Sequence, residues 1–243
     1  MVGKVTPVVT VLLALVGGTL GVLSPAGVAE AALLHDYDLN GTYADRLGGP
    51  PLVPNGGTLG PAGYTFAAGQ GLSLSNALRA SGDYSIEMGL TLDSTDGYRK
   101  LLDFKDLTSD NGLYDYYTSL YFYDLDQGPD GAFAAGVPAT VLLTRNGNTG
   151  EVVGYVNGVE QIRFIDAAGD ATFSAANNII NFLQDDTVTG GEDPSGFLDF
   201  VRISDGPTAQ TRAPALGVPG LFAMALFFLV LGARNLARRR SAA

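Results

Sequence analysis

Apolar and polar residues alternate in short runs through the middle of the chain, and turn residues separate the runs. The clearest run is 84–92, in which every second residue is apolar and Gly89 falls on the polar face. A period of two is typical of a β-strand with one buried face. Nine further runs predict strands at 33–39, 71–74, 101–104, 116–123, 139–144, 152–156, 161–165, 179–183 and 197–203.

The segments between these runs carry turn signals. Asn–Gly sequences occur at 146–148 and 157–158, and both residue types tolerate the positive φ that tight hairpins need. Residues 75–80 predict one short helical turn, and the pattern contains no longer amphipathic helix. Because many short strands occur without crossover helices, residues 32–206 predict a single all-β domain, an antiparallel sandwich.

Both ends of the chain have a different pattern. Residues 1–31 begin with a Lys, continue through an apolar stretch and finish in small residues around Ala31. That order is typical of a secretory signal peptide, here an N-terminal signal helix cleaved after Ala31. An uncleaved N-terminal membrane anchor is the alternative. Both interpretations place the domain outside the cytoplasm.

The C-terminal part predicts a membrane anchor. After a linker at 207–215, residues 216–233 form an uncharged apolar segment interrupted only by Pro219. As a helix its 18 positions would span about 27 Å, enough to cross a bilayer. Four arginines follow in the basic tail 234–243, so the positive-inside bias leaves the C-terminus of this transmembrane helix in the cytoplasm.

The composition excludes several classes of protein. Lys and Arg number 14 against 25 Asp and Glu, a net charge of −11, whereas a nucleic-acid binder needs clustered basic residues. The chain has no Cys, which excludes disulfides, thiolate catalysis and Cys-ligated metals. His35 is the single histidine, and we expect it to be an ordinary strand residue.

Five tyrosines crowd residues 114–123. Aromatic planes stack on the apolar C–H faces of sugar rings, and carboxylates accept hydrogen bonds from sugar hydroxyls. We predict that Tyr117, Tyr121 and Tyr123 share one strand face and form a ligand site with Asp124. The alternative is ordinary strand packing, since Tyr is favoured in strands and the chain has no Trp, the strongest stacking residue.

Two acidic clusters raise the question of calcium, which prefers several oxygen ligands. The run 124–131 fails the EF-hand pattern because Ala135 stands at its twelfth position. In the second cluster, Asp185, Asp186 and Glu192 are followed by Asp199, so four carboxylates are candidate ligands of one calcium ion. A solvated acidic loop is the alternative.

Four segments occur in an order and spacing seen in a known family: 37–41, 84–88, 154–159 and 196–203. The most specific are the Tyr-Val-Asn-Gly hairpin and the closing Gly-x-x-Asp-x-Val-Arg-Ile strand. They resemble the LamG-like, concanavalin A-like jelly-roll domains. The resemblance implies two curved antiparallel sheets with adjacent first and last strands. This fold hosts lectins, glycan-binding modules, glycosidases, lyases and adhesive domains, so it leaves function open.

Glycosidases need two carboxyl groups beside the scissile bond. Jelly-roll glucanases supply them from a Glu-x-Asp-x-Glu-like strand, which this sequence lacks. The predicted domain contains only Glu87, Glu151, Glu160 and Glu192, and Glu87 falls on the polar face of its strand. Asp pairs are an alternative source of carboxyl groups, but we expect a protein that is not an enzyme.

The tail has a second resemblance. Ala213-Pro214-Ala215-Leu216 precedes the apolar helix and an Arg cluster ends it, which resembles the PEP-CTERM and IPTL-CTERM sorting signals of bacteria. The sequence departs from them in having Ala213 where Ile or Val is usual, no Pro-Glu-Pro and no Trp. The resemblance implies cleavage by a membrane sortase and delivery to the envelope of a Gram-negative bacterium.

These observations predict an exported envelope or extracellular protein, anchored in the inner membrane or released after processing. Its expected role is a non-catalytic glycan-binding or interaction module with a polysaccharide partner. The alternatives are a structural or adhesive surface protein with a protein partner and a glycan-cleaving enzyme.

Overall fold

The computed structural model describes residues 31–174 and 178–208, and these residues form strands, turns and loops. The predicted transmembrane helix, the basic tail and residues 1–30 of the signal peptide lie outside the described residues. The described ranges contain no helix, so the helical turn predicted at 75–80 is wrong. A helical membrane span is accordingly absent from the described residues.

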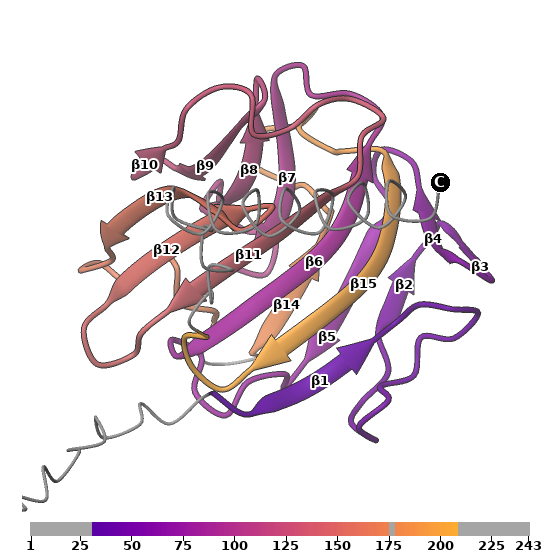
Figure 1. Cartoon of the computed structure of the whole chain (residues 1–243), viewed down its shortest axis with the longest axis horizontal. Helices are drawn as coiled ribbons and strands as arrows, with labels where there is room; N and C mark the ends of the chain where they lie inside the picture. The colour runs from indigo at the N-terminus through magenta and orange to yellow at the C-terminus, as the bar shows by residue number, and fades with distance from the viewer. Residues whose placement is uncertain (1–30, 175–177, 209–243) are drawn as a thin grey trace, which may run out of the picture. The chain divides into compact units, whose positions relative to one another are not determined.

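Two antiparallel sheets pack on one core (Figure 1). The eight-stranded sheet has the order β13(Val159–Ile165), β12(Glu151–Val156), β11(Ala139–Arg145), β6(Tyr84–Leu92), β15(Gly196–Ser204), β4(Gly63–Phe66), β3(Thr58–Gly60), and β1(Leu33–Tyr37) also pairs with β15. The seven-stranded sheet has the order β10(Asp126–Gln127), β9(Ser119–Tyr123), β8(Gly112–Tyr116), β7(Tyr98–Asp103), β14(Ile179–Phe182), β5(Gly71–Ser75), β2(Val53–Asn55). The described residues therefore form an all-β sandwich, and β1 pairs with β15 as the family resemblance implied.

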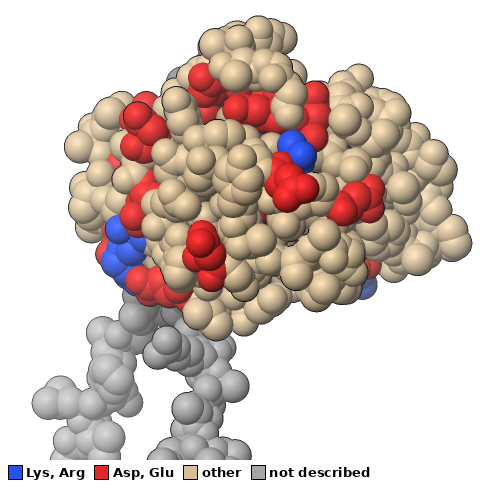
Figure 2. Space-filling model, turned by 90° about the horizontal axis from the view of Figure 1, so that it is seen from above, with Lys and Arg blue, Asp and Glu red and all other residues tan. Residues whose placement is uncertain are grey.

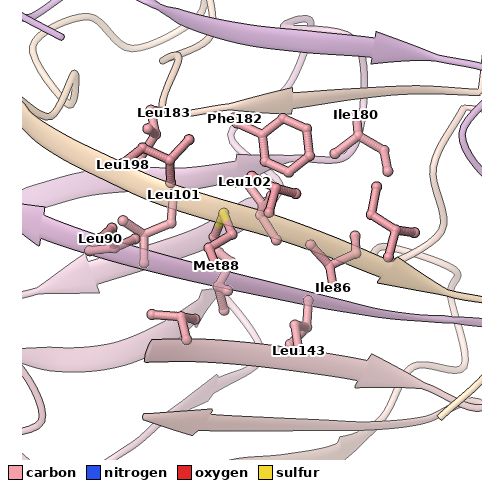
Figure 3. Packing of buried hydrophobic residues seen from close by; sticks show 14 of the residues in the cluster. Ile86, Met88, Leu90, Leu101, Leu102, Leu143, Ile180, Phe182, Leu183 and Leu198 are labelled. Carbon is pink, nitrogen blue, oxygen red and sulfur yellow. The ribbon is translucent and has the colours of Figure 1, made fainter. Parts of the chain in front are cut away.

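The alternation in β6 determines which face of its sheet is buried. Ile86 and Met88 are fully buried, whereas Glu87 between them lies 3.3 Å from Arg202 on the outer face. Figure 3 shows Ile86 and Met88 among side chains of the facing sheet such as Phe182. Each fully buried side chain of this size stabilises the fold by about 1.5–3 kcal/mol. A one-residue slip would move the whole set to the outer face, so the pattern also specifies the register.

Most predicted strands occur within a few residues of their expected ends, and the turn at Asn157-Gly158 has φ of 51° and 75° as predicted. Strands β2, β3, β4, β8 and β10 were not predicted. The single strand predicted at 116–123 is wrong, because the chain reverses inside it between β8 and β9.

The turn in that hairpin is made without Gly or Asn. Tyr117 and Thr118 have φ of 46° and 76°, a region that disfavours both side chains. The Thr118 amide donates to Asp115 Oδ1 at 3.0 Å, and the Ser119 hydroxyl donates to the Tyr116 carbonyl at 2.7 Å. These hydrogen bonds close the turn, and neither can be read from the local pattern of apolar residues.

Candidate functional site

Five tyrosines from three neighbouring strands form what we call the tyrosine surface: Tyr98 on β7, Tyr114 and Tyr116 on β8, and Tyr121 and Tyr123 on β9. Successive side chains of a strand point to opposite faces. Leu113, Leu120 and Phe122, which alternate with the tyrosines, lie in the hydrophobic core. The tyrosines are therefore on the outer face of the seven-stranded sheet.

Tyr98 is the centre of this surface. Its ring centroid lies 4.2 Å from that of Tyr116, 5.6 Å from Tyr114, 6.1 Å from Tyr123 and 6.2 Å from Tyr121. Most of these separations fall in the range of favourable aromatic pairs. Tyr114 is fully buried and the other four rings are half-buried. The result is a continuous aromatic layer with one side open.

The sequence-predicted ligand residues occupy two different places. Tyr121 and Tyr123 share the outer face of β9, with ring centroids 5.9 Å apart. Tyr117 does not share that face, because it lies in the β8–β9 turn, 57% exposed, with its ring centroid 4.9 Å from that of Tyr116. Asp124 is exposed immediately after β9, where burial and then the Asp124 charge raise the pKa of Tyr121.

Sequence reasoning missed Tyr98. It stands sixteen positions or more from the other four tyrosines, and the register that pairs it with Tyr116 is a property of the sheet. The available signal was the alternation of Tyr98 and Lys100 on one face of β7, which predicts that both side chains point the same way.

Lys100 anchors one side of the tyrosine surface. The Lys100 side chain is fully buried and forms ion pairs with Asp186 and, at 3.5 Å, with Asp103. Its ammonium also donates to the Ser109 carbonyl at 3.1 Å and lies 5.4 Å from the centroid of the Tyr114 ring. Although burial acts in the opposite direction, the hydrogen bond from Lys100 lowers the pKa of Asp186. The charge of Lys100 is therefore balanced by its buried carboxylate partners.

Glu192 lies beside Tyr114, whose hydroxyl donates to the Asp110 carbonyl at 3.0 Å. Burial, together with the charge of Asp185, raises the pKa of Glu192 to about 6. Burial also raises the pKa of Asp185, and its neighbour Asp186 adds to the effect. Carboxylates thus border the tyrosine surface at Tyr114 as well as at Asp124. On the face seen in Figure 2, acidic side chains outnumber basic ones.

The structure does not bring the four predicted calcium ligands together. Asp185 accepts backbone N–H groups of Asp186 and Glu192 at 2.9 and 3.0 Å, and Asp186 pairs with Lys100. Asp199 lies on β15 in the other sheet. Within 31–174 and 178–208, no group of three or more His, Asp or Glu side chains is arranged to hold a metal ion.

His35 has a partner that the sequence did not predict. Its Nδ1 lies 2.7 Å from Asp45 Oδ2 and its Nε2 2.9 Å from the Ala77 carbonyl, and only 8% of its surface is exposed. Both ring nitrogens are engaged, so His35 connects β1 to two loops and has no nitrogen directed at a ligand.

A separate pocket of about 350 Å³ opens on the eight-stranded sheet. The aromatic part of its lining is Phe197 and Phe200, and Asp199 and Asn157 contribute polar groups. It shares no residue with the tyrosine surface.

No family model matches this chain, and no curated protein matches it. Among solved structures, it is similar to domain 4 of AbnA, an extracellular GH43 arabinanase from Geobacillus stearothermophilus in complex with arabinotriose. The TM-score is 0.54 at 16% identity, covering 75% of this chain and 97% of that domain. It is also similar to Trypanosoma rangeli sialidase in complex with sialic acid, with a TM-score of 0.54 at 15% identity over 76% of this chain.

A third neighbour is the binding domain of botulinum neurotoxin serotype D, with a TM-score of 0.50 at 10% identity over 74% of this chain. The chain spans 32% of the sialidase and 49% of the neurotoxin domain. At these identities the similarities show a shared β-sandwich fold.

Proposed function

We propose that this protein is an exported, non-catalytic glycan-binding module built on a LamG-like, concanavalin A-like jelly roll. The observation that carries the proposal is the tyrosine surface. It offers adjacent aromatic planes for the C–H faces of a polysaccharide, and Asp124 and Glu192 beside them can accept hydrogen bonds from sugar hydroxyls. Because the rings belong to neighbouring strands, the platform is formed before a ligand arrives, and binding orders few side chains.

Export is part of the proposal and is supported by the sequence of the two ends. A signal peptide at 1–31 and the apolar, Arg-flanked segment at 216–233 would deliver the domain to the envelope, with cleavage of the tail by a membrane sortase. The intact mass of the mature protein isolated from cells tests both cleavages. A mass that retains residues 1–31 and 216–243 would contradict processing at either end.

We propose that binding occurs without catalysis. Asp185 and Asp186 are engaged by backbone amides and by Lys100, which leaves Glu192 as the carboxyl group beside Tyr114 with a raised pKa. Assays for new reducing ends and for unsaturated products test this point on every glycan that binds. Turnover that disappears in Glu192→Gln would overturn the non-catalytic assignment.

The binding experiment uses the full chain, kept in solution with a mild detergent, on an array of neutral and acidic polysaccharides. We expect Tyr98→Ala to weaken binding at least tenfold, because it removes the ring that contacts the other four. Tyr155→Ala on β12, in the opposite sheet, is the matched control and should bind like the native protein. Equal binding by both variants would refute the tyrosine surface as the site. If the native protein binds none of the polysaccharides on the array, the alternative of a surface protein with a protein partner is favoured.

A further inference from the structure

Carboxylates border the tyrosine surface at both ends. At one end Asp124 is exposed and directly follows Tyr123, the last residue of β9. At the other end the Lys100 amide donates to the Glu192 carbonyl at 3.0 Å, and the Lys100 ammonium, 5.4 Å from the centroid of the Tyr114 ring, pairs with Asp186. A polymer that lies along the tyrosine surface from β9 to Tyr114 therefore passes between two groups of carboxylates.

Among the described residues, Lys100 is the cation that contacts a ring of this surface, and it is not available to a ligand. Its side chain is fully buried, and Asp186, Asp103 and the Ser109 carbonyl surround its ammonium. The net effect of Lys100 is to neutralise carboxylates that already lie inside the protein. It offers no exposed positive charge to an incoming uronate or sulfate.

The neighbouring cation on β7 is Arg99, whose contacts differ from those of Lys100. It stands between Tyr98 and Lys100 on β7, pairs across the sheet with Asp115, and its charge acts on the buried carboxyl group of that residue. Its Nη1 donates to the Tyr98 carbonyl at 2.8 Å and to the Gly191 carbonyl at 3.5 Å. The guanidinium of Arg99 is therefore engaged by two backbone carbonyls as well as by the charge of Asp115.

We infer that the tyrosine surface selects uncharged polysaccharides and rejects polyanionic ones. This inference rests on the proposed function and adds the class of ligand to it. The contribution of ring stacking to affinity does not depend on the charge of the polymer, since charged and uncharged sugars both present a C–H face. The bordering carboxylates repel every uronate or sulfate that is brought within a few ångströms of them, and like charges at an interface exclude the wrong partner.

The test compares each acidic polymer with its own uncharged form. Alginate, polygalacturonate and hyaluronate are used beside the same polymers after their carboxylates have been reduced to alcohols, so that chain length and ring shape change little. We expect the full chain to bind at least one reduced polymer at least tenfold more tightly than its acidic parent. Raising sodium chloride from about 0.1 M to about 1 M shortens the screening length from about 10 Å to about 3 Å and should narrow the difference.

Variants assign the selection to particular carboxylates. Asp124→Asn combined with Glu192→Gln should lower the ratio of the two affinities, reduced polymer over acidic parent, at least threefold. The ratio is the readout because both side chains also contact neutral sugars in the proposed site. Asp93→Asn combined with Asp199→Asn is the matched control, because it removes two exposed carboxylates, one directly after β6 and one on β15 of the opposite sheet. If this control pair has the same effect as the change of Asp124 and Glu192, net charge alone is responsible and the inference fails.

Failure of the inference can be separated from failure of the proposed function. If acidic parents bind as tightly as the reduced polymers, and Tyr98→Ala abolishes both, glycan binding at this surface stands and the charge selection is overturned. If the native chain binds no neutral or acidic glycan, both the proposed function and the inference that rests on it are refuted. Preference for the reduced polymer that disappears in the double variant of Asp124 and Glu192 supports both.

Discussion

Asp115 is a buried carboxyl group whose titration should be visible in the stability of the whole domain. Its side chain is fully buried on β8, Oδ1 accepts the Thr118 amide, and Oδ2 has no hydrogen-bond partner. Burial raises the pKa of Asp115 from 3.8 to about 7, although the Thr118 amide and the Arg99 charge act in the opposite direction. The folded protein therefore holds this proton at pH values where the unfolded chain has lost it.

The sign of the pH dependence follows from that difference. Where the folded state binds more protons than the unfolded state, the free energy of unfolding falls as the pH rises. A difference of about 3 pKa units, at about 1.4 kcal/mol for each, corresponds to a loss of about 4 kcal/mol between about pH 4 and about pH 7. Asp115→Asn keeps an oxygen for the Thr118 amide and cannot ionise, so this loss should be absent from the variant.

Urea denaturation of the full chain, followed by circular dichroism at several values between about pH 4 and about pH 8, measures the effect. We expect Asp115→Asn to unfold near the native midpoint at the acidic end and at a clearly higher urea concentration at the basic end. Asp130→Asn, an exposed residue, is the control and should reproduce the native pH profile. Parallel profiles for the native protein and Asp115→Asn, or a less stable variant at about pH 8, would refute the reasoning.

Two further changes probe the packing around the tyrosine surface. Lys100→Met leaves the buried carboxylate of Asp186 without its cation and should lower the free energy of unfolding by about 3–5 kcal/mol in urea denaturation. Adding Asp186→Asn removes the charge and keeps an oxygen for the Val188 and Thr189 amides, so it should recover part of that loss. A double variant no more stable than Lys100→Met would contradict the ion-pair explanation. Tyr117→Asn places a residue that tolerates positive φ in the β8–β9 turn and should raise the urea midpoint, with a gain of about 1 kcal/mol. A lower midpoint would show that the contact of Tyr117 with Tyr116 outweighs the backbone conformation.

The hairpins show where local pattern suffices and where it does not. The β12–β13 turn was predicted because Asn157 and Gly158 accept positive φ through their own chemistry. The β8–β9 turn uses Tyr117 and Thr118, whose side chains disfavour that conformation, and Asp115 and Ser119 supply the hydrogen bonds that hold it. A continuous run of strand-forming residues therefore concealed a reversal of the chain.

The candidate site divides in a similar way. The density of tyrosines between 114 and 123, and the sharing of one face by Tyr121 and Tyr123, follow from composition and a period of two. The central ring, Tyr98, joins them only because β7 pairs with β8 in a register that sets it opposite Tyr116. The four predicted calcium ligands looked close in sequence, yet Asp199 belongs to a strand of the other sheet.

What the sequence by itself determined is the set of properties that depend on neighbours along the chain: the alternating strands, the buried face of β6, the Asn–Gly turns and the excess of acidic residues. Only the tertiary structure decided which strands lie side by side, which tyrosines meet, and that Lys100 is enclosed by carboxylates. The physical reason is that cross-strand pairing and burial join residues far apart in the chain, and their free energies depend on the register of whole strands.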